Sequence, residues 1–194
     1  MKAATNQVND NQLITLFKQG NNNALETLIN RHKERIFTSI IILTKDKYLA
    51  EDLFQDLFIK IIDTLRDGRY NEEGKFLPWA LRVAHNLVVD HFRKVNRKPP
   101  IVTSDKQDIF EAINVVEESA DESMMRFQGN ERIRRIVDML PEEQREVIVL
   151  RHYADLSFKE IAEITNCSIN TALGRMRYGL MNLRKLMAEK QIAY

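Results

Sequence analysis

Cysteines and long apolar runs are scarce in this chain, and each absence excludes a class of protein. Cys167 is the only cysteine among 194 residues, so no disulfide can form within the chain, which fits a reducing compartment. The aliphatic run Ile40–Leu43 is far shorter than the roughly 20 residues that span a bilayer. Residues 1–10 are polar and lack the apolar centre of a signal peptide. We therefore expect a cytoplasmic protein with no membrane insertion.

The residue patterns of common enzymes are missing as well. The sequence has no glycine-rich phosphate loop and no nucleophile elbow. Of the four histidines, His85 and His91 lie near Asp90, but their spacing is not the i, i+4 pair of a helical zinc site. The sequence therefore predicts a protein that is not an enzyme, with no cofactor and no metal site.

The net charge of +1 conceals an uneven distribution along the chain. Residues 105–122 hold seven acids and one base, whereas residues 165–188 hold four bases and no acid. A protein that binds a polyanion needs local positive charge rather than a high overall isoelectric point. The C-terminal part is therefore a candidate for contact with nucleic acid.

The spacing of apolar residues predicts an all-α fold: two small helical domains joined by a flexible linker, the second a helix-turn-helix domain. In residues 10–95 we expect a short helix capped by Asp10 and closed by Gly20, then helices from about residue 23, over 48–65 and over 76–94. The third helix carries one buried line, Leu53, Leu57, Ile61 and Leu65. The linker is the acidic segment 96–130, opened by Pro99-Pro100, and residues 131–190 form the second domain.

A helix-turn-helix is predicted over residues 157–187. Ser157 and Glu160 have the spacing of a capping box, Asn166 suits a left-handed turn, and Ser168 can cap the next helix. That helix is expected to bury Ile169, Ala172, Leu173, Met176, Leu180 and Leu183. Its other side carries the expected DNA contacts, Asn170, Thr171, Arg175 and Arg177, with Ser168 before them. An ordinary helical hairpin packed in a core is the alternative.

The fourth helix of the first domain mixes aromatic and polar residues on one side. Trp79, Arg82, Asn86, Asp90 and Arg93 are spaced by three or four residues, and Phe76 opens the helix. Aromatic rings can stack on unpaired bases, and polar tips can read base edges. From helical spacing alone, a core tryptophan beside a solvated charged face is the favoured interpretation.

Three segments change this interpretation: Ala50–Lys60, Phe76–Asn86 with Asp90 and Arg93, and Leu140–Ile164. Together they resemble one known family, the extracytoplasmic-function group of the sigma-70 family of bacterial sigma factors. The resemblance extends over roughly residues 13–187, and the order and spacing of the segments make it specific. It implies a factor that binds core RNA polymerase, reads the minus-thirty-five element of promoter DNA and melts the minus-ten element.

The resemblance also implies roles for single residues. Asp52, Gln55 and Asp56 correspond to the surface that docks on core RNA polymerase, with a solvated acidic face as the alternative. The residues expected at the minus-ten element are Phe76, Trp79, Arg82, Asn86, Asp90 and Arg93, with the loop 66–75 capturing a flipped base. The residues expected at the minus-thirty-five element are Ser168, Asn170, Thr171, Arg175 and Arg177. An anti-sigma factor is a further expected partner.

The chain departs from the family pattern in the recognition helix. Leu173, Tyr178 and Met181 stand where the family often has lysine or arginine, and Asn166 replaces the usual turn glycine. We therefore expect weak binding to free DNA, with the polymerase supplying the rest. The acidic linker is either a solvated tether or a segment that enters the basic RNA path of the polymerase.

Two other functions fit a helix-turn-helix chain. One is a transcriptional regulator whose N-terminal domain senses a ligand or dimerises, and which binds duplex DNA without polymerase. The other is a helical adaptor that binds only proteins. Reconstitution with core RNA polymerase separates both from a sigma factor.

Overall fold

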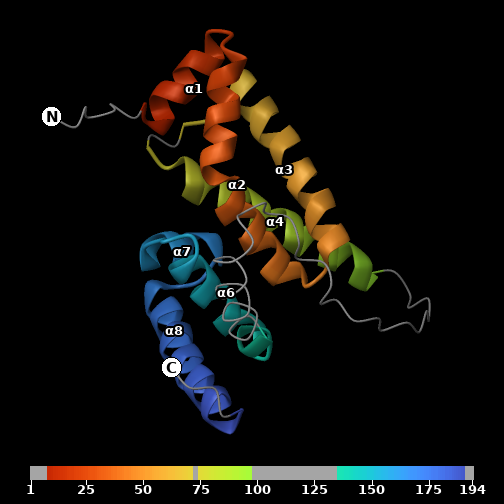
Figure 1. Ribbon diagram of the computed structural model, residues 1–194, viewed down its shortest axis with the longest axis vertical. Coiled ribbons are helices and arrows are strands. Elements are labelled where there is room, and N and C mark those ends of the chain that lie inside the picture. Colours follow the sequence, from red (N-terminus) through yellow and green to blue (C-terminus); the bar gives the residue numbers. More distant parts are fainter. Residues whose placement is uncertain (1–7, 72–73, 98–134, 191–194) are drawn as a thin grey trace, which may run out of the picture.

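The computed structural model describes residues 8–71, 74–97 and 135–190, and every regular element among them is a helix, as predicted (Figure 1). The first unit holds four helices, α1 (Asp10–Lys18), α2 (Asn22–Thr44), α3 (Lys47–Arg66) and α4 (Phe76–Arg97). The second unit holds a helical turn at 135–138 and then α6 (Glu142–His152), α7 (Phe158–Ile164) and α8 (Ile169–Glu189). Residues 98–130 of the expected linker lie outside the described residues.

Long apolar stripes on α2, α3 and α4 form the core of the first unit. The predicted line on α3 is confirmed, since Leu53, Leu57, Ile61 and Leu65 are all buried. They meet Leu28, Ile36 and Ile40 of α2 in one continuous cluster. Each fully buried leucine or isoleucine stabilises the fold by about 1.5–3 kcal/mol relative to its exposed state. The core therefore holds α3 and α4 in fixed positions, with their polar sides outward.

The start of α1 differs from the prediction by one residue. Asn9, not Asp10, is the N-cap, because its side chain accepts a hydrogen bond from the backbone N–H of Gln12. The Gln12 side chain in turn accepts from the backbone N–H of Asn9, which completes a capping box. The Asp10 carboxylate is thereby free to bind other groups. Gly20 ends the helix at a φ of +97°, where a side chain would be strained.

The recognition helix α8 is turned differently from the prediction. Ala172 and Gly179 are buried, whereas Ile169, Leu173 and Leu180, which were expected to be buried, are 46%, 44% and 36% exposed. The reason is the close approach of α8 to α6. A Cβ atom at Gly179 would lie 2.9 Å from Cδ1 of Ile148, so the line of closest packing follows the small residues.

The two glycines of α8 are expected to respond in opposite ways to alanine. At Gly174 nothing lies within 4 Å of the added Cβ, so Gly174→Ala should stabilise the chain by about 0.5–1 kcal/mol through helix propensity. At Gly179 the Cβ would also lie 3.3 Å from Cβ of Gln144, and overpacking costs about 1–3 kcal/mol. In thermal unfolding, the melting temperature of Gly174→Ala should be higher than that of the parent chain, and the melting temperature of Gly179→Ala should be lower. Equal melting temperatures for the two variants would contradict this account of the α6–α8 contact.

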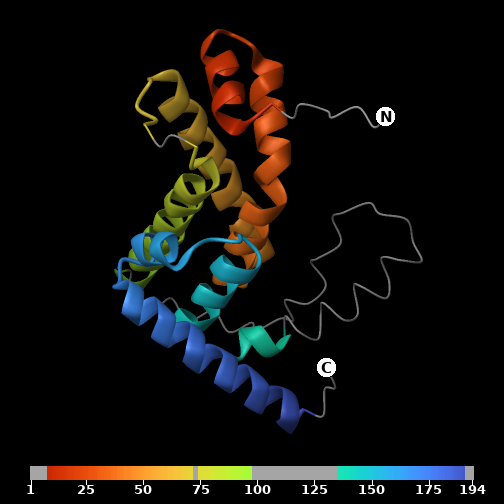
Figure 2. The same ribbon diagram turned by 90° about the vertical axis from the view of Figure 1, so that its left-hand side faces the viewer.

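The two units pack against each other rather than standing apart. Both views place α6 against the lower half of α2 and α7 beside α4 (Figures 1 and 2). Ile42 of α2 forms an apolar cluster with Val137 and Val149 of the second unit. Lys45, at the end of α2, donates a hydrogen bond of 2.7 Å from Nζ to the carbonyl oxygen of Asp138. The fold is therefore a closed arrangement of its two units.

None of the helices in the described ranges is both long and apolar enough to cross a membrane.

Candidate nucleic-acid and polymerase interfaces

The α4 helix presents most of the expected minus-ten residues on one accessible side. Asn86, Asp90 and Arg93 are exposed, and Trp79 and Arg82 are half-buried. Arg93 and Asp90 form a long ion pair of 3.9 Å one turn apart on the surface. An exposed pair of this kind is weak, so both groups can rearrange to meet a ligand.

Phe76 is a correction to the predicted set. Its side chain is 1% exposed, so it cannot stack on a base in this conformation. It lies beneath Trp79 instead, with ring centroids 5.9 Å apart. Tyr70 of the preceding loop packs edge-to-face on Trp79 at 4.8 Å. Phe76 and Tyr70 therefore fix the position of the tryptophan, whose remaining accessible surface is available for stacking.

His85 lies on the side of α4 next to this surface, beside Asn86, and joins the two units. Its Nε2 lies 2.9 Å from Oε1 of Glu146 on α6, and both side chains are largely buried. Burial alone lowers the pKa of His85, but the hydrogen bond and the charge of Glu146 outweigh it, so the pKa lies above its ordinary value. The pair is therefore strongest when His85 is protonated. No local pattern could have predicted this contact, because its partners are 61 positions apart.

The predicted helix-turn-helix is confirmed in its local geometry. Ser157 and Glu160 form the capping box of α7, and Asn166 adopts a left-handed backbone with a φ of +51°. The Ser168 hydroxyl accepts from the backbone N–H of Thr171 at 3.0 Å and caps α8. Two helices joined by a capped four-residue turn are the arrangement that places a second helix in a major groove.

The expected minus-thirty-five residues differ in how accessible they are. Ser168, Asn170, Thr171 and Arg177 are exposed, whereas Arg175 is half-buried. The Arg175 guanidinium points toward α6, where Nη2 lies 3.9 Å from the Glu143 carboxylate. The Ser168 and Thr171 hydroxyls bond each other at 2.8 Å. Among the described residues, Asn170 and Arg177 thus have no such competing contact, and both are exposed to solvent.

The α3 helix carries a mixed acidic and apolar stripe that the sequence analysis recognised only in part. Asp52, Gln55 and Asp56 are exposed as expected. Spacing of three or four residues adds Tyr48, Ile59 and Asp63 to the same side, and Tyr48 and Ile59 are 79% and 59% exposed. We call these six residues the α3 stripe. An exposed apolar side chain rimmed by charges is typical of a protein-binding surface, and this spacing was visible in the sequence.

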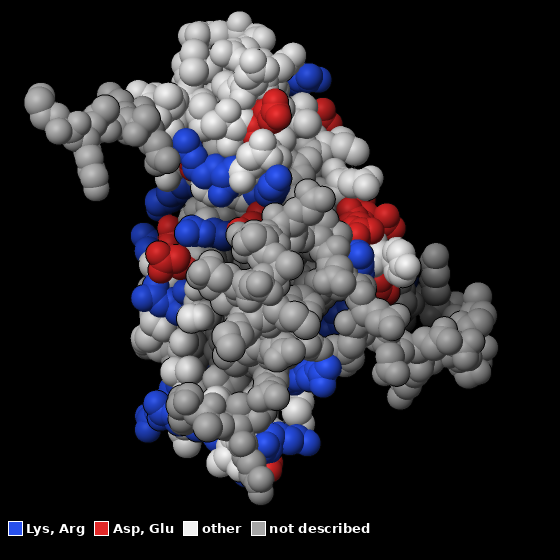
Figure 3. Space-filling view, viewed as in Figure 1, with Lys and Arg blue, Asp and Glu red and all other residues white. Residues whose placement is uncertain are grey.

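The two candidate surfaces differ in their prevailing charge. In the view of Figure 3, acidic side chains gather on the side where α3 lies, and the opposite edge, beside α7, carries lysines and arginines with some acidic side chains among them. An acidic surface favours a basic protein partner, and a basic surface favours an anionic duplex.

Comparison with known families matches two parts of the chain. Residues 28–98 match the description Sigma-70 region 2, and residues 130–176 match the description Sigma-70, region 4. The first match contains most of the first helical unit and all of α4, and the second contains the helix-turn-helix turn. The two matches together span more than half of the chain.

Relatives that align over most of the chain are also named as sigma factors. The RNA polymerase sigma-H factor of Pseudomonas aeruginosa is 28% identical over 174 residues, which are 88% of this chain and 89% of the relative. The ECF RNA polymerase sigma factor SigW of Bacillus subtilis is 26% identical over 178 residues, covering 89% and 93%. The ECF RNA polymerase sigma-E factor of Escherichia coli is 25% identical, covering 88% and 90%.

Two solved structures share the fold. CnrH, in complex with the cytosolic domain of CnrY, superposes with a TM-score of 0.65 at 21% identity over 93% of this chain and 97% of its own. RpoE of Bartonella quintana, in complex with the anti-sigma factor NepR, superposes with a TM-score of 0.62 at 18% identity, over 84% and 96%.

Proposed function

This chain belongs to the sigma-70 family of RNA polymerase sigma factors, in its extracytoplasmic-function group. On that basis we propose which of its surfaces binds each partner during transcription initiation. Residues 10–95 bind core polymerase and hold the melted minus-ten element. Residues 131–190 read the minus-thirty-five element through α7 and α8, and residues 96–130 connect the two. The α7–α8 geometry carries this proposal, because a capped helix-turn-helix with an exposed polar helix side fits a major groove.

In the minus-ten unit, Trp79, Arg82, Asn86, Asp90 and Arg93 contact the separated strand. Trp79 offers a ring face for stacking, which contributes about 1–3 kcal/mol per base. Phe76 acts indirectly, by supporting Trp79 from the core.

In the minus-thirty-five unit, the accessible residues Asn170 and Arg177 make the main contacts, and Ser168 and Thr171 lie near the phosphates. Arg175 contributes only if it leaves Glu143.

The α3 stripe docks on core RNA polymerase. Its three aspartates meet a basic partner, and Tyr48 and Ile59 supply apolar area at the same contact. The polymerase performs the chemistry of RNA synthesis, so the chain acts in the cytoplasm without enzymatic activity of its own.

An anti-sigma factor is a further proposed partner. The relatives CnrH and RpoE were each solved with a bound protein, the CnrY cytosolic domain and the anti-sigma factor NepR. A protein of that kind would hold this chain inactive by covering the surfaces that polymerase and DNA need.

The decisive experiment is reconstitution with core RNA polymerase. The holoenzyme should select promoter sequences and form open complexes without ATP hydrolysis, whereas neither partner alone does so. A helix-turn-helix regulator would instead bind duplex DNA tightly without polymerase. If the chain fails to associate with core enzyme, or directs it to no start site, the proposed function is wrong.

The closed arrangement cannot engage both promoter elements at once. Elements centred ten and thirty-five base pairs upstream are separated by about 85 Å of duplex, at about 3.4 Å per base pair. In the closed arrangement α7 packs on α4. The start of α8 is five residues beyond the end of α7, so it can lie at most about 18 Å from the end of α7. The two units must therefore separate when the chain works on a promoter.

Arg177 is expected to matter more than Arg175 for promoter binding by the holoenzyme. Arg177→Ala should weaken binding by about 1–3 kcal/mol if the guanidinium contacts a base. If it contacts a phosphate, the slope of the logarithm of the binding constant against the logarithm of salt concentration should fall by about one. Arg175→Ala serves as the matched control, because it removes the same group from a site beside Glu143. Binding measured over a range of salt concentrations compares the two. A larger loss for Arg175→Ala would show that α8 reads DNA with a different side.

A further inference from the structure

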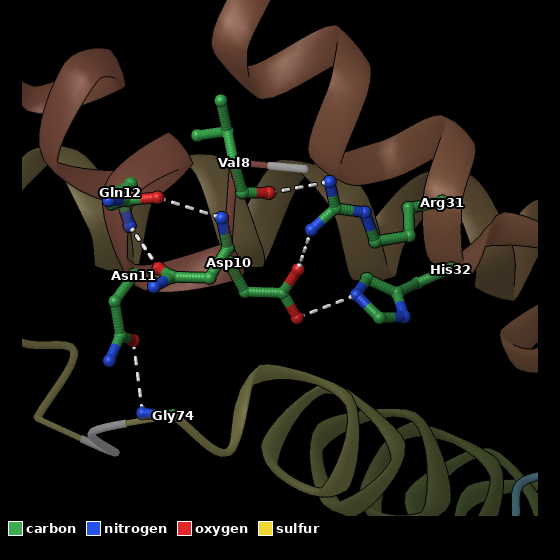
Figure 4. A network of polar contacts seen from close by, with 8 residues as sticks. Val8, Asp10, Asn11, Gln12, Arg31, His32 and Gly74 are labelled. Carbon is green, nitrogen blue, oxygen red and sulfur yellow. Dashed lines mark hydrogen bonds and ion pairs between the residues drawn. The ribbon is translucent and has the colours of Figure 1, made fainter. Parts of the chain in front are cut away.

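The short helix α1 is tied by polar bonds to α2, and α2 in turn packs on the start of α4, the helix that follows the expected base-capturing loop. The Asp10 carboxylate lies 2.6 Å from Nη1 of Arg31 and 2.8 Å from Nε2 of His32, both on α2 (Figure 4). Arg31 also donates from Nη2 to the carbonyl oxygen of Val8 at 2.8 Å. The His32 ring is buried and packs on the ring of Phe76, at the first residue of α4, with centroids 5.4 Å apart. The N-terminal end of α1 is therefore fixed relative to α4.

The next residue, Asn11, contacts the loop itself. Its Oδ1 accepts a hydrogen bond of 3.0 Å from the backbone N–H of Gly74, as Figure 4 shows. Gly74 has a φ of +69°, so it is a turn residue held in the left-handed region two residues before α4 begins. The contact joins residues 63 positions apart and is the place where α1 meets the end of the loop.

The beginning of the loop is held by different contacts. The backbone N–H of Arg69 donates to the carbonyl oxygen of Thr64 at 3.1 Å. Tyr70 is buried and packs on Trp79. Tyr70 thus holds the first part of the loop against the core, and Asn11 binds Gly74 at the end next to α4. Core packing alone does not fix Gly74, because it is exposed.

We propose that Asn11 is a positioning residue for minus-ten specificity: by accepting a hydrogen bond from the Gly74 N–H, it fixes the α4 end of the loop expected to select the minus-ten base, without contacting DNA. This inference rests on the proposed function of the loop. A hydrogen bond of this kind contributes about 1 kcal/mol, so its loss allows Gly74 to sample other positions and lowers discrimination by about fivefold.

The test uses holoenzyme reconstituted from the full chain and core RNA polymerase. Transcription is measured from a set of promoters that share one minus-thirty-five element and differ by single bases in the minus-ten element. Asn11→Ala removes the acceptor and should reduce the preference for the best promoter about fivefold. Asn11→Asp keeps an oxygen acceptor at the same place and should restore the preference. Hydrogen exchange at the Gly74 amide should accelerate in Asn11→Ala and remain slow in Asn11→Asp.

Gln12→Ala is the matched control. It removes the capping-box bond to the N–H of Asn9 and weakens α1 without touching Gly74, so it should leave the preference unchanged. The proposal is overturned if Asn11→Ala keeps full discrimination, if Asn11→Asp loses it equally, or if Gln12→Ala loses it equally. Parent holoenzyme that shows no minus-ten preference would refute the proposed function itself, and this inference with it.

Discussion

Replacing Asp52 and Asp56 together by lysine is expected to weaken binding to core RNA polymerase by about a hundredfold, because like charges brought together at an interface cost several kcal/mol. Both carboxylates are exposed on the α3 stripe, and the buried line of α3 lies on the opposite side of the helix. The fold should therefore be unaffected, and circular dichroism checks this. Binding is measured by titrating labelled core enzyme with the chain.

The matched control reverses two other exposed acids, Glu26 and Glu34 of α2. This control changes the net charge by the same amount away from the α3 stripe. If it weakens core binding equally, the effect comes from overall charge and the docking surface is wrongly assigned. Ile59→Ala tests the apolar part of the stripe and should lower affinity about tenfold, the loss expected when a central apolar anchor is truncated.

His85→Ala is expected to open the closed arrangement. It leaves the largely buried Glu146 carboxylate without its partner, and this cost disappears when the units separate and water reaches the carboxylate. The equilibrium between closed and open forms should therefore shift toward the open form by about tenfold. Energy transfer between dyes on α2 and on the C-terminal half of α8 reports the distance between the units. His91→Ala, on the same helix, is the control, since the His91 ring contacts Phe92 and not Glu146.

The same contact makes opening depend on pH. Because the pKa of His85 is raised in the closed form, the pair stabilises that form fully below the ordinary value of 6.5, and the stabilisation is lost as pH rises through the raised pKa. Glu146, Glu142 and Asn86 are the groups that raise it. The open fraction should thus increase from pH 6 to pH 8 in the parent chain. Glu146→Gln should abolish this dependence. An unchanged pH dependence in Glu146→Gln would mean that another group controls opening.

Features that depend on neighbours in sequence were predicted from the sequence. The buried line on α3, the Ser157–Glu160 capping box, the left-handed Asn166 and the Ser168 cap all follow from interactions within a few residues. Side-chain chemistry and helical spacing fix such features before any tertiary packing forms. The exposed α3 stripe belongs to the same class, although Tyr48 and Ile59 were overlooked.

Features that depend on distant partners were missed or wrong. The sequence could not reveal that Gly179 brings α8 against α6, and the predicted burial of Ile169, Leu173 and Leu180 failed for that reason. Helical spacing places Phe76 on the core side of α4, and only the family resemblance assigned it to the minus-ten element, where its burial beneath Trp79 leaves no ring face for a base. The assignment of Asp10 as a cap failed because its carboxylate binds Arg31 and His32, which are 21 and 22 positions away.

The sequence by itself determined the helices, the caps of α7 and α8, the order of the two units and their family. Tertiary structure alone decided the closed packing of the units, the orientation of the recognition helix and the bond between Asn11 and Gly74. The physical reason is range: a helix and its caps arise from residues three or four positions apart, whereas which side chains meet across helices depends on shape and burial summed over the whole fold.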